Sequence, residues 1–357
     1  MTNIAGLMFT DFHAHLFKDF SKPDPEFHTD RFRDQLATLE TILKRAQELK
    51  VPVIFGGDLF HKRIYVDSRV FNPIFDMIAK YSDVQIILVR GNHDSVTNSL
   101  HSISSLDTLS NLPNVVVFTE PSYMEVGTGE TAFMLHGLPY GEEIADMKMW
   151  LNNSVKQMEK FELPNLLVAH IGVDGATVGQ YSHTLEGAFT VGDLHPDKFD
   201  YIYLGHYHKR QELAPNVIYG GNTIQTSFSD EGQTKGYHEL LISEDGTMST
   251  NYVEIPNKMF ITVTGDNIPD NDILENNYIR FTGTEEQAKV VNDIVSTGGL
   301  TNVRVTVQRD YSEESRLGVT ADTSEEDILT SYVALKELPD TLGVKALECL
   351  REAKNDK

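Results

Sequence analysis

Apolar runs and amphipathic stretches alternate along the first 257 residues. One apolar stripe repeats at steps of four and three, which predicts a helix lying on a sheet; its members are Phe32, Leu36, Leu39, Leu43 and Ala46. Residues 68–80 and 142–160 are also expected to be helical. Six runs predict strands, several too apolar for an exposed face: 51–56, 84–91, 114–119, 131–137, 165–170 and 200–206. The pattern predicts a layered α/β fold, with helices on both faces of a mixed sheet.

The pattern changes after residue 257. Three shorter apolar runs and a polar helix starting at Thr284 predict a small β-β-α-β unit, which we expect to pack on the first domain because it is too small to stand alone. An acidic segment with little apolar content then predicts a linker. Ser324 and Asp327 form a capping-box start for a helical tail that Pro339 interrupts. The predicted organisation is 1–257, 258–311, 312–323 and 324–357.

Composition narrows the class of protein. At 40% hydrophobic residues, the 357-residue chain is expected to be globular. The single cysteine, Cys349, excludes internal disulfides and Cys-based zinc sites, which fits a reducing compartment. No apolar run reaches the roughly 18 residues that span a bilayer. The first apolar run has no basic segment before it and leads into Asp11, so we expect a core strand, not a signal peptide, and a cytoplasmic protein, in the host cytoplasm if the chain is viral.

The charge balance limits the partners. Thirty basic and 53 acidic residues give a net charge of −23. Taken alone, this balance argues against a polyanion such as DNA, because phosphate groups are usually bound by Lys and Arg.

The first chemical signal is "LMFTDFHAH" at residues 7–15. Its Asp-x-His-x-His pattern could end the first strand of an amidohydrolase-like barrel, in which a His-x-His pair binds metal. It could equally open a two-metal phosphoesterase that uses Asp11 and His13 and leaves His15 idle. A surface loop with two ordinary histidines is the third interpretation.

Polar side chains follow an apolar run at four further places. In open α/β sheets such strand ends share one edge, where sites are built, so residues far apart in sequence can meet there. The five segments are "DFH" (Asp11, His13), "GGDLFH" (Asp58, His61), "GNHD" (Asn92, His93, Asp94), "AH" (His170) and "GHYH" (His206, His208).

These residue types suit a pair of divalent cations. A carboxylate can bridge two ions because each oxygen binds one, and Asp58 is the natural bridge. Neutral imidazoles and the Asn92 amide add donors without adding negative charge. With Asp11 and Asp58 as the only carboxylates, two ions would leave the site at about +2, which would attract a phosphate diester even to an acidic protein. The mixture of oxygen and imidazole donors suits Mn²⁺, Fe²⁺ or Zn²⁺ better than Ca²⁺.

His93 is the candidate acid. It follows the predicted ligand Asn92 and precedes Asp94, which we expect to hold its ring and stabilise the protonated form. This position predicts a general acid for the leaving oxygen or a stabiliser of the transition state.

Nearby positive side chains are candidates for contacts with a phosphate backbone: Lys62, Arg63, Arg90, Lys209 and Arg210.

The five segments, in this order, resemble the calcineurin-like metallophosphoesterase superfamily. Within it, "GGDLFHKR" and "FTVGDLHPDKFDYIYLGHYHKRQ" resemble the Mre11/SbcD DNA repair nucleases, including those of tailed bacteriophages. The resemblance covers roughly residues 5–255 and favours the phosphoesterase interpretation, because an amidohydrolase explains none of the later segments. The chain departs from the family at His15, where a small residue is common, and in its acidic charge.

The resemblance implies a metallophosphoesterase-type fold and a ligand set. One ion would be bound by Asp11, His13, Asp58 and His208, and the other by Asp58, Asn92, His170 and His206. The counterparts of His61 and His93 contact or reposition the scissile phosphate. Residues 258–311 would be the capping domain that helps admit DNA. The tail 324–357 would bind the coiled-coil root of a Rad50/SbcC-like ATPase.

The expected function is therefore a Mn²⁺-dependent DNA exonuclease and endonuclease in repair and recombination. A phosphatase or cyclic-nucleotide phosphodiesterase of the same superfamily is the alternative, and a scaffold with a vestigial site is a third. Pairing of two copies of the chain through helices near 68–80 and 99–110 is left open.

Overall fold

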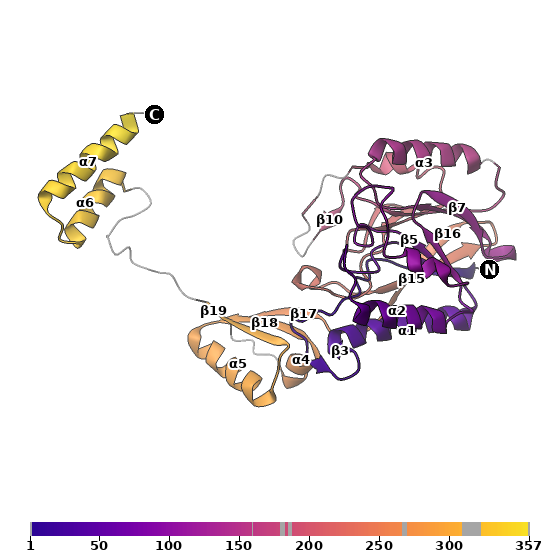
Figure 1. The fold of residues 1–357 in the computed structure, drawn as a ribbon, viewed down its shortest axis with the longest axis horizontal. Coiled ribbons are helices and arrows are strands. Elements are labelled where there is room, and N and C mark those ends of the chain that lie inside the picture. Colours follow the sequence, from indigo (N-terminus) through magenta and orange to yellow (C-terminus); the bar gives the residue numbers. More distant parts are fainter. Residues whose placement is uncertain are drawn as a thin grey trace. The chain divides into compact units, whose positions relative to one another are not determined.

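The fold is described from a computed structural model that covers residues 2–158, 160–178, 183–184, 188–265, 270–308 and 323–355. The chain divides into two compact units, Met1–Thr306 and Val307–Lys357. Each is described by itself (Figure 1).

The larger unit is built on two six-stranded sheets. The first has the order β16-β15-β1-β4-β5-β6, in which β1 (Thr2–Phe9), β4 (Val53–Phe55), β5 (Ile86–Val89) and β6 (Val115–Phe118) are parallel, whereas β15 (Gly236–Ser243) and β16 (Met248–Glu254) form an antiparallel hairpin beside β1. The second has the order β13-β14-β12-β9-β8-β7. Its centre is parallel, with β14 (Val217–Tyr219), β12 (Tyr201–Gly205), β9 (Asn165–His170) and β8 (Phe133–Leu138), and its edges β13 (Gln211–Ala214) and β7 (Ser122–Val126) are antiparallel.

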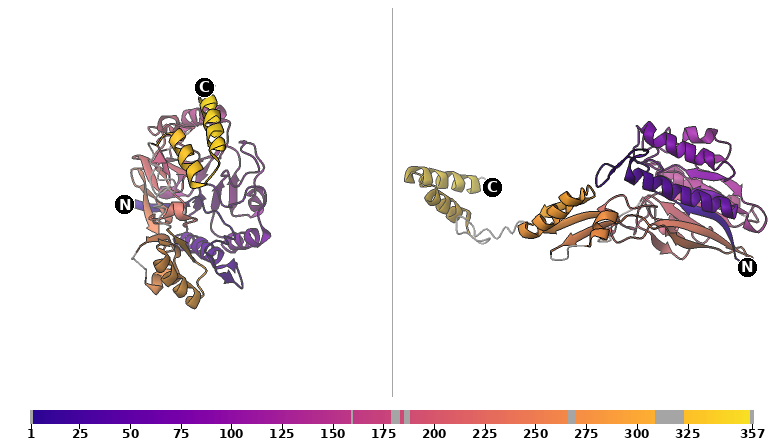
Figure 2. Two further views of the ribbon diagram at one scale, coloured as in Figure 1. Left: turned by 90° about the vertical axis from the view of Figure 1, so that its left-hand side faces the viewer. Right: turned by 90° about the horizontal axis from the view of Figure 1, so that it is seen from below.

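Helices cover the outer face of each sheet. The first sheet packs on α1 (Asp30–Leu49) and α2 (Ser68–Lys80), and the second on α3 (Ile144–Met158) (Figures 1 and 2). The two inner faces pack on each other through side chains such as Met8, Ile54, Leu166 and Tyr203. The result is a four-layer α/β/β/α arrangement, which confirms the predicted layered α/β fold. It differs from the prediction in having two stacked sheets, each with helices on one face, where one sheet with helices on both faces was expected.

Alternation along the strands explains the continuous apolar runs. In β1, Leu7 and Phe9 face the helices, whereas Met8 faces the second sheet. In β4, Val53 and Phe55 face the helices in the same way. Because both faces of each sheet are covered, the buried ends of these strands, residues 7–9 of β1 and 53–55 of β4, are apolar throughout.

Short elements complete the larger unit. They are β2 (Pro23–Asp24), β3 (His28–Thr29), β10 (Thr177–Val178), β11 (His183–Thr184) and the 3-10 helices η1 (Asp107–Asn111), η2 (Gly129–Thr131), η3 (Val191–Leu194) and η4 (Phe228–Asp230). The helix considered at 99–110 is wrong, because only the 3-10 turn of η1 forms there.

A small α+β subdomain, here called the cap, follows the double sheet. It consists of a three-stranded sheet and two helices, in the chain order β17 (Phe260–Thr264), α4 (Asn271–Asn276), β18 (Tyr278–Gly283), α5 (Glu285–Gly298) and β19 (Val303–Val307). The sequence predicted β-β-α-β and missed α4. Since β17 and β18 are parallel, the chain must cross over between them, and α4 lies in this connection. The cap has its own apolar core around Leu274 and Phe281.

The cap is bonded to the layered body of the unit. The backbone N–H of Phe260 donates to Gln225 Oε1 at 2.7 Å, and Thr301 Oγ1 donates to the Ser21 carbonyl at 2.8 Å. Lys258 Nζ lies 2.6 Å from Asp30 Oδ2.

The smaller unit contains a pair of helices, α6 (Glu325–Leu335) and α7 (Asp340–Asn355). Ser324 Oγ accepts from the backbone N–H of Asp327 at 3.1 Å, as its capping position predicts. Arg351 on α7 pairs with Glu326 on α6. The predicted linker 312–323 lies almost wholly outside the described residues. Among the described helices, none is both long and apolar enough to cross a membrane.

Arg90 is fully buried where β5 ends. Its guanidinium donates to Ser95 Oγ at 2.5 Å and to the carbonyl oxygens of Leu100 and Tyr140 at 2.6 and 2.9 Å. These bonds tie two loops beside the strand ends to each other. The predicted contact of Arg90 with a phosphate backbone is therefore wrong, because its donors are used inside the protein.

Replacing Arg90 by Met is expected to lower the free energy of unfolding by about 3 kcal/mol, because the carbonyls of Leu100 and Tyr140 would stay buried without donors. Arg69→Met is the matched control, since Arg69 is exposed and, among the described residues, pairs with Asp67 on the surface. It should leave stability nearly unchanged. Urea unfolding measures both. Equal losses in the two variants would contradict this account of Arg90.

Candidate metal centre

The polar segments singled out in the sequence meet at one edge of the double sheet. Asp11 and His13 follow β1, Asp58 follows β4, and Asn92 follows β5. From the second sheet, His170 ends β9, and His206 and His208 follow β12. Because these five strands point the same way within their sheets and the sheets are stacked, their carboxyl ends converge.

Three donors form the first group. Oxygen and nitrogen atoms of Asp11, His13 and His208 all lie within 4.8 Å of one another. His13 Nε2 is 3.0 Å from His208 Nε2 and 3.9 Å from Asp11 Oδ1.

The second group lies beside the first. Asn92 Oδ1 is 3.1 Å from His170 Nε2 and 3.0 Å from His206 Nδ1. Asp58 Oδ2 faces both groups, at 3.8 Å from His13 Nε2 and 3.4 Å from His170 Nε2. All seven predicted ligands are thus within reach of two neighbouring positions, with Asp58 between them.

The donor set fits two cations. In neutral rings, the facing Nε2 atoms of His13 and His208 can each carry a lone pair that a metal ion would accept. His13 is buried, and its other ring nitrogen, Nδ1, has no hydrogen-bond partner among the described residues. Burial also lowers the pKa of His13 well below its usual value, so the ring is neutral at pH 7. A neutral, buried ring is the form that binds a metal ion.

The backbone that carries the ligands is unusual. Four of them, none of which is glycine, have φ in the left-handed region: Asp11 (51°), His13 (50°), Asp58 (63°) and His206 (101°). Such residues cost about 1 to 3 kcal/mol each and cluster at functional sites. The strain is held by backbone bonds between the loops, from Asp11 N to the Gly57 carbonyl and from His13 N to the Asp58 carbonyl, at 2.9 and 3.0 Å.

Gly91 is required for space. A Cβ at this position would overlap Oδ1 and the backbone nitrogen of Asp58. The chain between β5 and Asn92 can therefore pass behind the bridging carboxylate only as glycine.

Asp94 is buried and supports the loop of Asp58. Its Oδ2 accepts from the backbone N–H groups of Asp58 and Gly91 at 2.8 and 3.1 Å, and its Oδ1 from that of Phe60 at 3.1 Å. The predicted contact between Asp94 and the ring of His93 does not form. Instead, His93 Nδ1 lies 2.6 Å from the carbonyl oxygen of His61.

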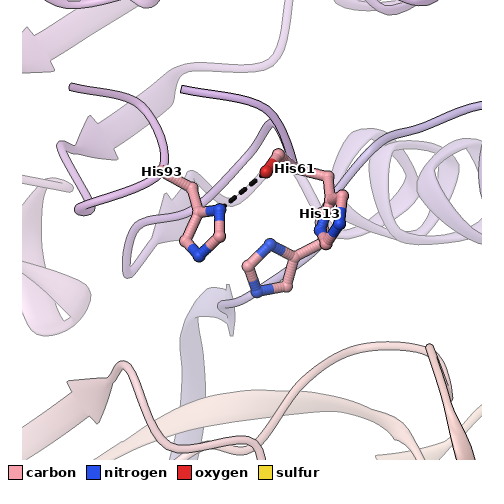
Figure 3. A group of neighbouring side chains, drawn as sticks. All are labelled: His13, His61 and His93. Carbon is pink, nitrogen blue, oxygen red and sulfur yellow. Dashed lines mark hydrogen bonds between the residues drawn. The ribbon is translucent and has the colours of Figure 1, made fainter. Parts of the chain in front are cut away.

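Two further imidazoles, those of His61 and His93, lie beside the predicted ligand His13 (Figure 3). The rings of His61 and His93 stack at 5.6 Å with 20° between their planes, and one nitrogen each of His13, His61 and His93 lie within 4.8 Å of one another. Burial lowers the pKa of His61 to about 4, so this ring is neutral at pH 7.

His15 extends this row of rings outward. It is half-buried, its ring centroid lies 5.1 Å from that of His61, and it lines a cavity of about 1330 Å³ with His61 and His208. Its backbone N–H donates to Gln35 Oε1 at 3.2 Å, and Gln35 Nε2 donates to the carbonyl of His13 at 3.0 Å. Gln35 was missed in the sequence. The available signal was a polar residue three positions after Phe32, on the apolar side of α1.

Buried charges set the protonation of the centre. Burial works against ionisation of Asp58, but the positive field of His170 prevails and lowers the pKa of this carboxyl. Burial likewise disfavours a charged His170, yet the charge of Asp58 raises its pKa to about 9. His170 Nδ1 donates to the Gly56 carbonyl at 2.8 Å, which aims Nε2 at Asp58. Without a cation, a proton on His170 therefore compensates the carboxylates.

Comparison with known proteins identifies the family. The model of the calcineurin-like phosphoesterase family matches residues 7–210, which contain all seven donors. The chain belongs to this family. The family match and the double sheet also show that the amidohydrolase-barrel interpretation of residues 7–15 was wrong.

The phosphoesterase chain is similar to several known proteins. It is 25% identical over 276 residues to the SbcD component of the nuclease SbcCD of Staphylococcus epidermidis, which covers 68% of this chain and 71% of that protein. Among solved structures, a dimetal phosphatase from Danio rerio matches 71% of this chain and 98% of its own, with a TM-score of 0.43 and 11% identity. A putative 5′-nucleotidase from Staphylococcus aureus matches 71% of this chain and 54% of its own, with a TM-score of 0.45 and 14% identity.

Metal uptake by this phosphoesterase is expected to depend on pH. Because the pKa of His170 is about 9 without metal, a cation must displace its proton at pH 7. The apparent affinity for Mn²⁺ should therefore rise between pH 7 and 8.5, by roughly tenfold per pH unit. Titration against a metal indicator under argon measures it. His101→Gln, an exposed histidine paired with Glu120, is the control and should keep the same slope; an affinity that does not change with pH would contradict the prediction.

Proposed function

We propose that this chain is a two-metal phosphodiesterase that cuts DNA as an exonuclease and endonuclease, and that it is the nuclease subunit of an Mre11-Rad50/SbcCD-like repair and recombination complex. The observation that carries the proposal is the convergence of seven metal-type donors on two neighbouring positions with Asp58 between them. The similarity to the nuclease component of SbcCD supports the choice of DNA as substrate.

The two cation positions share Asp58 in this proposal, and each has three further ligands. Asp11, His13, Asp58 and His208 hold one ion, and Asp58, Asn92, His170 and His206 hold the other, with Mn²⁺ favoured and Mg²⁺, Fe²⁺ or Zn²⁺ as alternatives. When bound, the cations supply positive charge for phosphate oxygens and lower the pKa of the attacking water.

His93 is the proposed general acid. Its Nδ1–H donates to the His61 carbonyl at 2.6 Å, which fixes the ring and leaves Nε2 to give a proton to the leaving oxygen. The neutral ring of His61 contacts a phosphate oxygen as an N–H donor. Asp94 acts through Asp58, whose loop it holds, and is a positioning residue.

Hollows on two sides of the centre favour an extended substrate. The cavity of about 1330 Å³ begins at His208 and His61 and reaches the cap at Phe260. A second cavity of about 280 Å³ lies beside His206 and is lined by Tyr140. A strand that passes through the centre can occupy both, whereas a small phosphomonoester needs neither.

The net charge of −23 does not prevent this function. Two cations outweigh the charges of Asp11 and Asp58 and attract a phosphodiester locally. An ATPase partner would supply the wider DNA-binding surface.

Purified full-length protein with Mn²⁺ is expected to release nucleotides from end-labelled single-stranded and duplex DNA. Asp58→Asn should abolish cleavage because it removes the ligand shared by both cations. His93→Gln should lower the turnover number by about 10²- to 10⁴-fold while Mn²⁺ binding is retained. Asp197→Asn, at an exposed acid paired with Lys198, is the control for loss of one negative charge.

Two results would overturn the proposal. One is wild-type protein that leaves DNA intact while it hydrolyses phosphomonoesters or cyclic nucleotides, which would favour the phosphatase or phosphodiesterase alternative. The other is equal cleavage by wild type and Asp58→Asn.

The helix pair α6–α7 is the proposed docking site for the ATPase. An apolar cavity of about 540 Å³ between the helices is lined by residues that include Ile328, Leu329, Tyr332 and Leu350. Tyr332 and Leu342 are large, apolar and about half exposed, at 45% and 53%. An apolar groove between two helices suits an apolar segment of a partner helix.

Tyr332→Asp is expected to weaken binding to a Rad50/SbcC-like ATPase from the same genome by about tenfold or more, because a charge would enter the apolar groove. Lys336→Asp is the matched control, since Lys336 is exposed directly after the same helix and does not line the cavity. Copurification of the full-length chains measures binding. Equal binding by the two variants would exclude this groove as the docking site.

A further inference from the structure

A buried ionic pair lies behind the metal ligand His208, outside every motif described above. Asp230 and Lys235 are only 1% and 5% exposed. Asp230 Oδ1 lies 3.5 Å from Lys235 Nζ and 3.7 Å from His208 Nδ1. Burying two charges is costly, and a pair that served packing alone could be replaced by apolar side chains.

The carboxylate of Asp230 is fixed in one orientation. Its Oδ2 accepts from the backbone N–H of Thr226 at 2.8 Å, from Thr226 Oγ1 at 2.9 Å and from Asn222 Nδ2 at 3.1 Å. With Oδ2 occupied by these donors and by the backbone N–H of Ser227 at 3.4 Å, Oδ1 is the atom that faces the imidazole.

Lys235 holds the same ligand through its backbone. Lys235 Nζ donates to the carbonyl oxygen of His208 at 3.0 Å and to Gln233 Oε1 at 2.8 Å. The pair therefore contacts His208 twice, at the ring through Asp230 and at the main chain through Lys235.

The carboxylate of Asp230, 3.7 Å from Nδ1, biases which nitrogen of His208 carries hydrogen. A carboxylate oxygen only accepts, so it favours a hydrogen on Nδ1. The lone pair is then on Nε2, the nitrogen that faces His13 Nε2 at 3.0 Å. Carboxylates that orient a metal-binding histidine in this way raise its basicity as a ligand.

We propose that Asp230, supported by Lys235, is a positioning residue that keeps the His208 ring in its metal-binding tautomer and thereby sets the affinity of one cation position, that of Asp11, His13, Asp58 and His208. The inference rests on the proposed two-metal site and does not depend on the identity of the substrate.

Asp230→Asn tests the proposal sharply because the donors around Oδ2 dictate how the amide turns. The amide oxygen must accept from the Thr226 N–H and hydroxyl, so the NH₂ group points at His208 Nδ1. A donor there favours hydrogen on Nε2, the nitrogen that the metal needs. The variant keeps the shape of the side chain and reverses the tautomer.

The measurement is Mn²⁺ binding to the full-length protein, with free Mn²⁺ read from its electron paramagnetic resonance signal. Wild type is expected to bind two ions. Asp230→Asn should weaken one of them by about 10- to 100-fold and leave the other nearly unchanged. This readout requires no catalysis.

Glu231→Gln is the matched control. The neighbouring Glu231 accepts from the backbone N–H and the hydroxyl of Thr262 in the cap and lies 3.9 Å from Arg280. The Glu231→Gln variant loses one negative charge, as Asp230→Asn does, at the next residue. Both ions should bind to it as they bind to wild type. A similar loss in Glu231→Gln would show a general effect of charge and overturn the proposal.

Thr226→Val is the milder variant, because it removes one hydrogen bond from Asp230 and keeps the charge. It should weaken the same ion as Asp230→Asn, by a smaller factor, and it decides the question if Asp230→Asn does not fold. An unchanged affinity, or equal weakening of both ions, overturns the positioning role. If wild type binds no Mn²⁺, the two-metal site itself fails, whereas tight Mn²⁺ binding without DNA cleavage contradicts only the proposed function.

Discussion

The centre is organised by the burial of two carboxylates, Asp11 and Asp58, at one edge of a double sheet. They are 0% and 2% exposed, and uncompensated charge at such depth costs several kcal/mol. The loops around them provide donors: the backbone N–H of His93 reaches Asp58 Oδ1 at 2.7 Å, and that of His206 reaches Asp11 Oδ2 at 3.1 Å. These bonds do not neutralise the charge, and, against the effect of burial, the carboxylate of Asp58 raises the pKa of His170. A proton or a cation can compensate such carboxylates, so the residues whose burial is costly are also the donors of the candidate metal centre.

The layered fold and the convergence of the five polar segments could be predicted because both follow from local sequence. Strands buried on both faces appear as continuous apolar runs, and polar residues just after such runs must lie at the strand ends. The left-handed conformations of Asp11, His13, Asp58 and His206 could not be predicted, because no glycine or asparagine marks them and bonds between loops impose them. Asp230 was missed for a related reason: its segment follows no apolar run, and only the return of the chain beside His208 gives it a role.

Asp94 shows where proximity in sequence misleads. It follows His93 directly, yet it turns back to the end of β4 and holds the loop of Asp58, while His93 finds its partner in the His61 carbonyl. Adjacent side chains in a tight loop point in different directions, so neighbours in sequence are often not neighbours in the site. The consequence for the chemistry is favourable. A carboxylate beside His93 would hold a proton on its ring more tightly, whereas a carbonyl orients the ring without adding negative charge where the proposed reaction would place a phosphate.

The segment from 222 to 235 joins the cap to the metal centre. Gln225 and Glu231 bond to β17 of the cap, and between and after them Asp230 and Lys235 hold His208. Because these contacts alternate along one short stretch that includes η4, the same segment contacts both the cap and His208. The cavity that leads to the centre is lined by residues of this stretch, including Thr226 and Phe228, and by Phe260 of the cap. The residues that line this cavity and the residues that contact His208 therefore belong to one segment, so a substitution in this segment is expected to affect both.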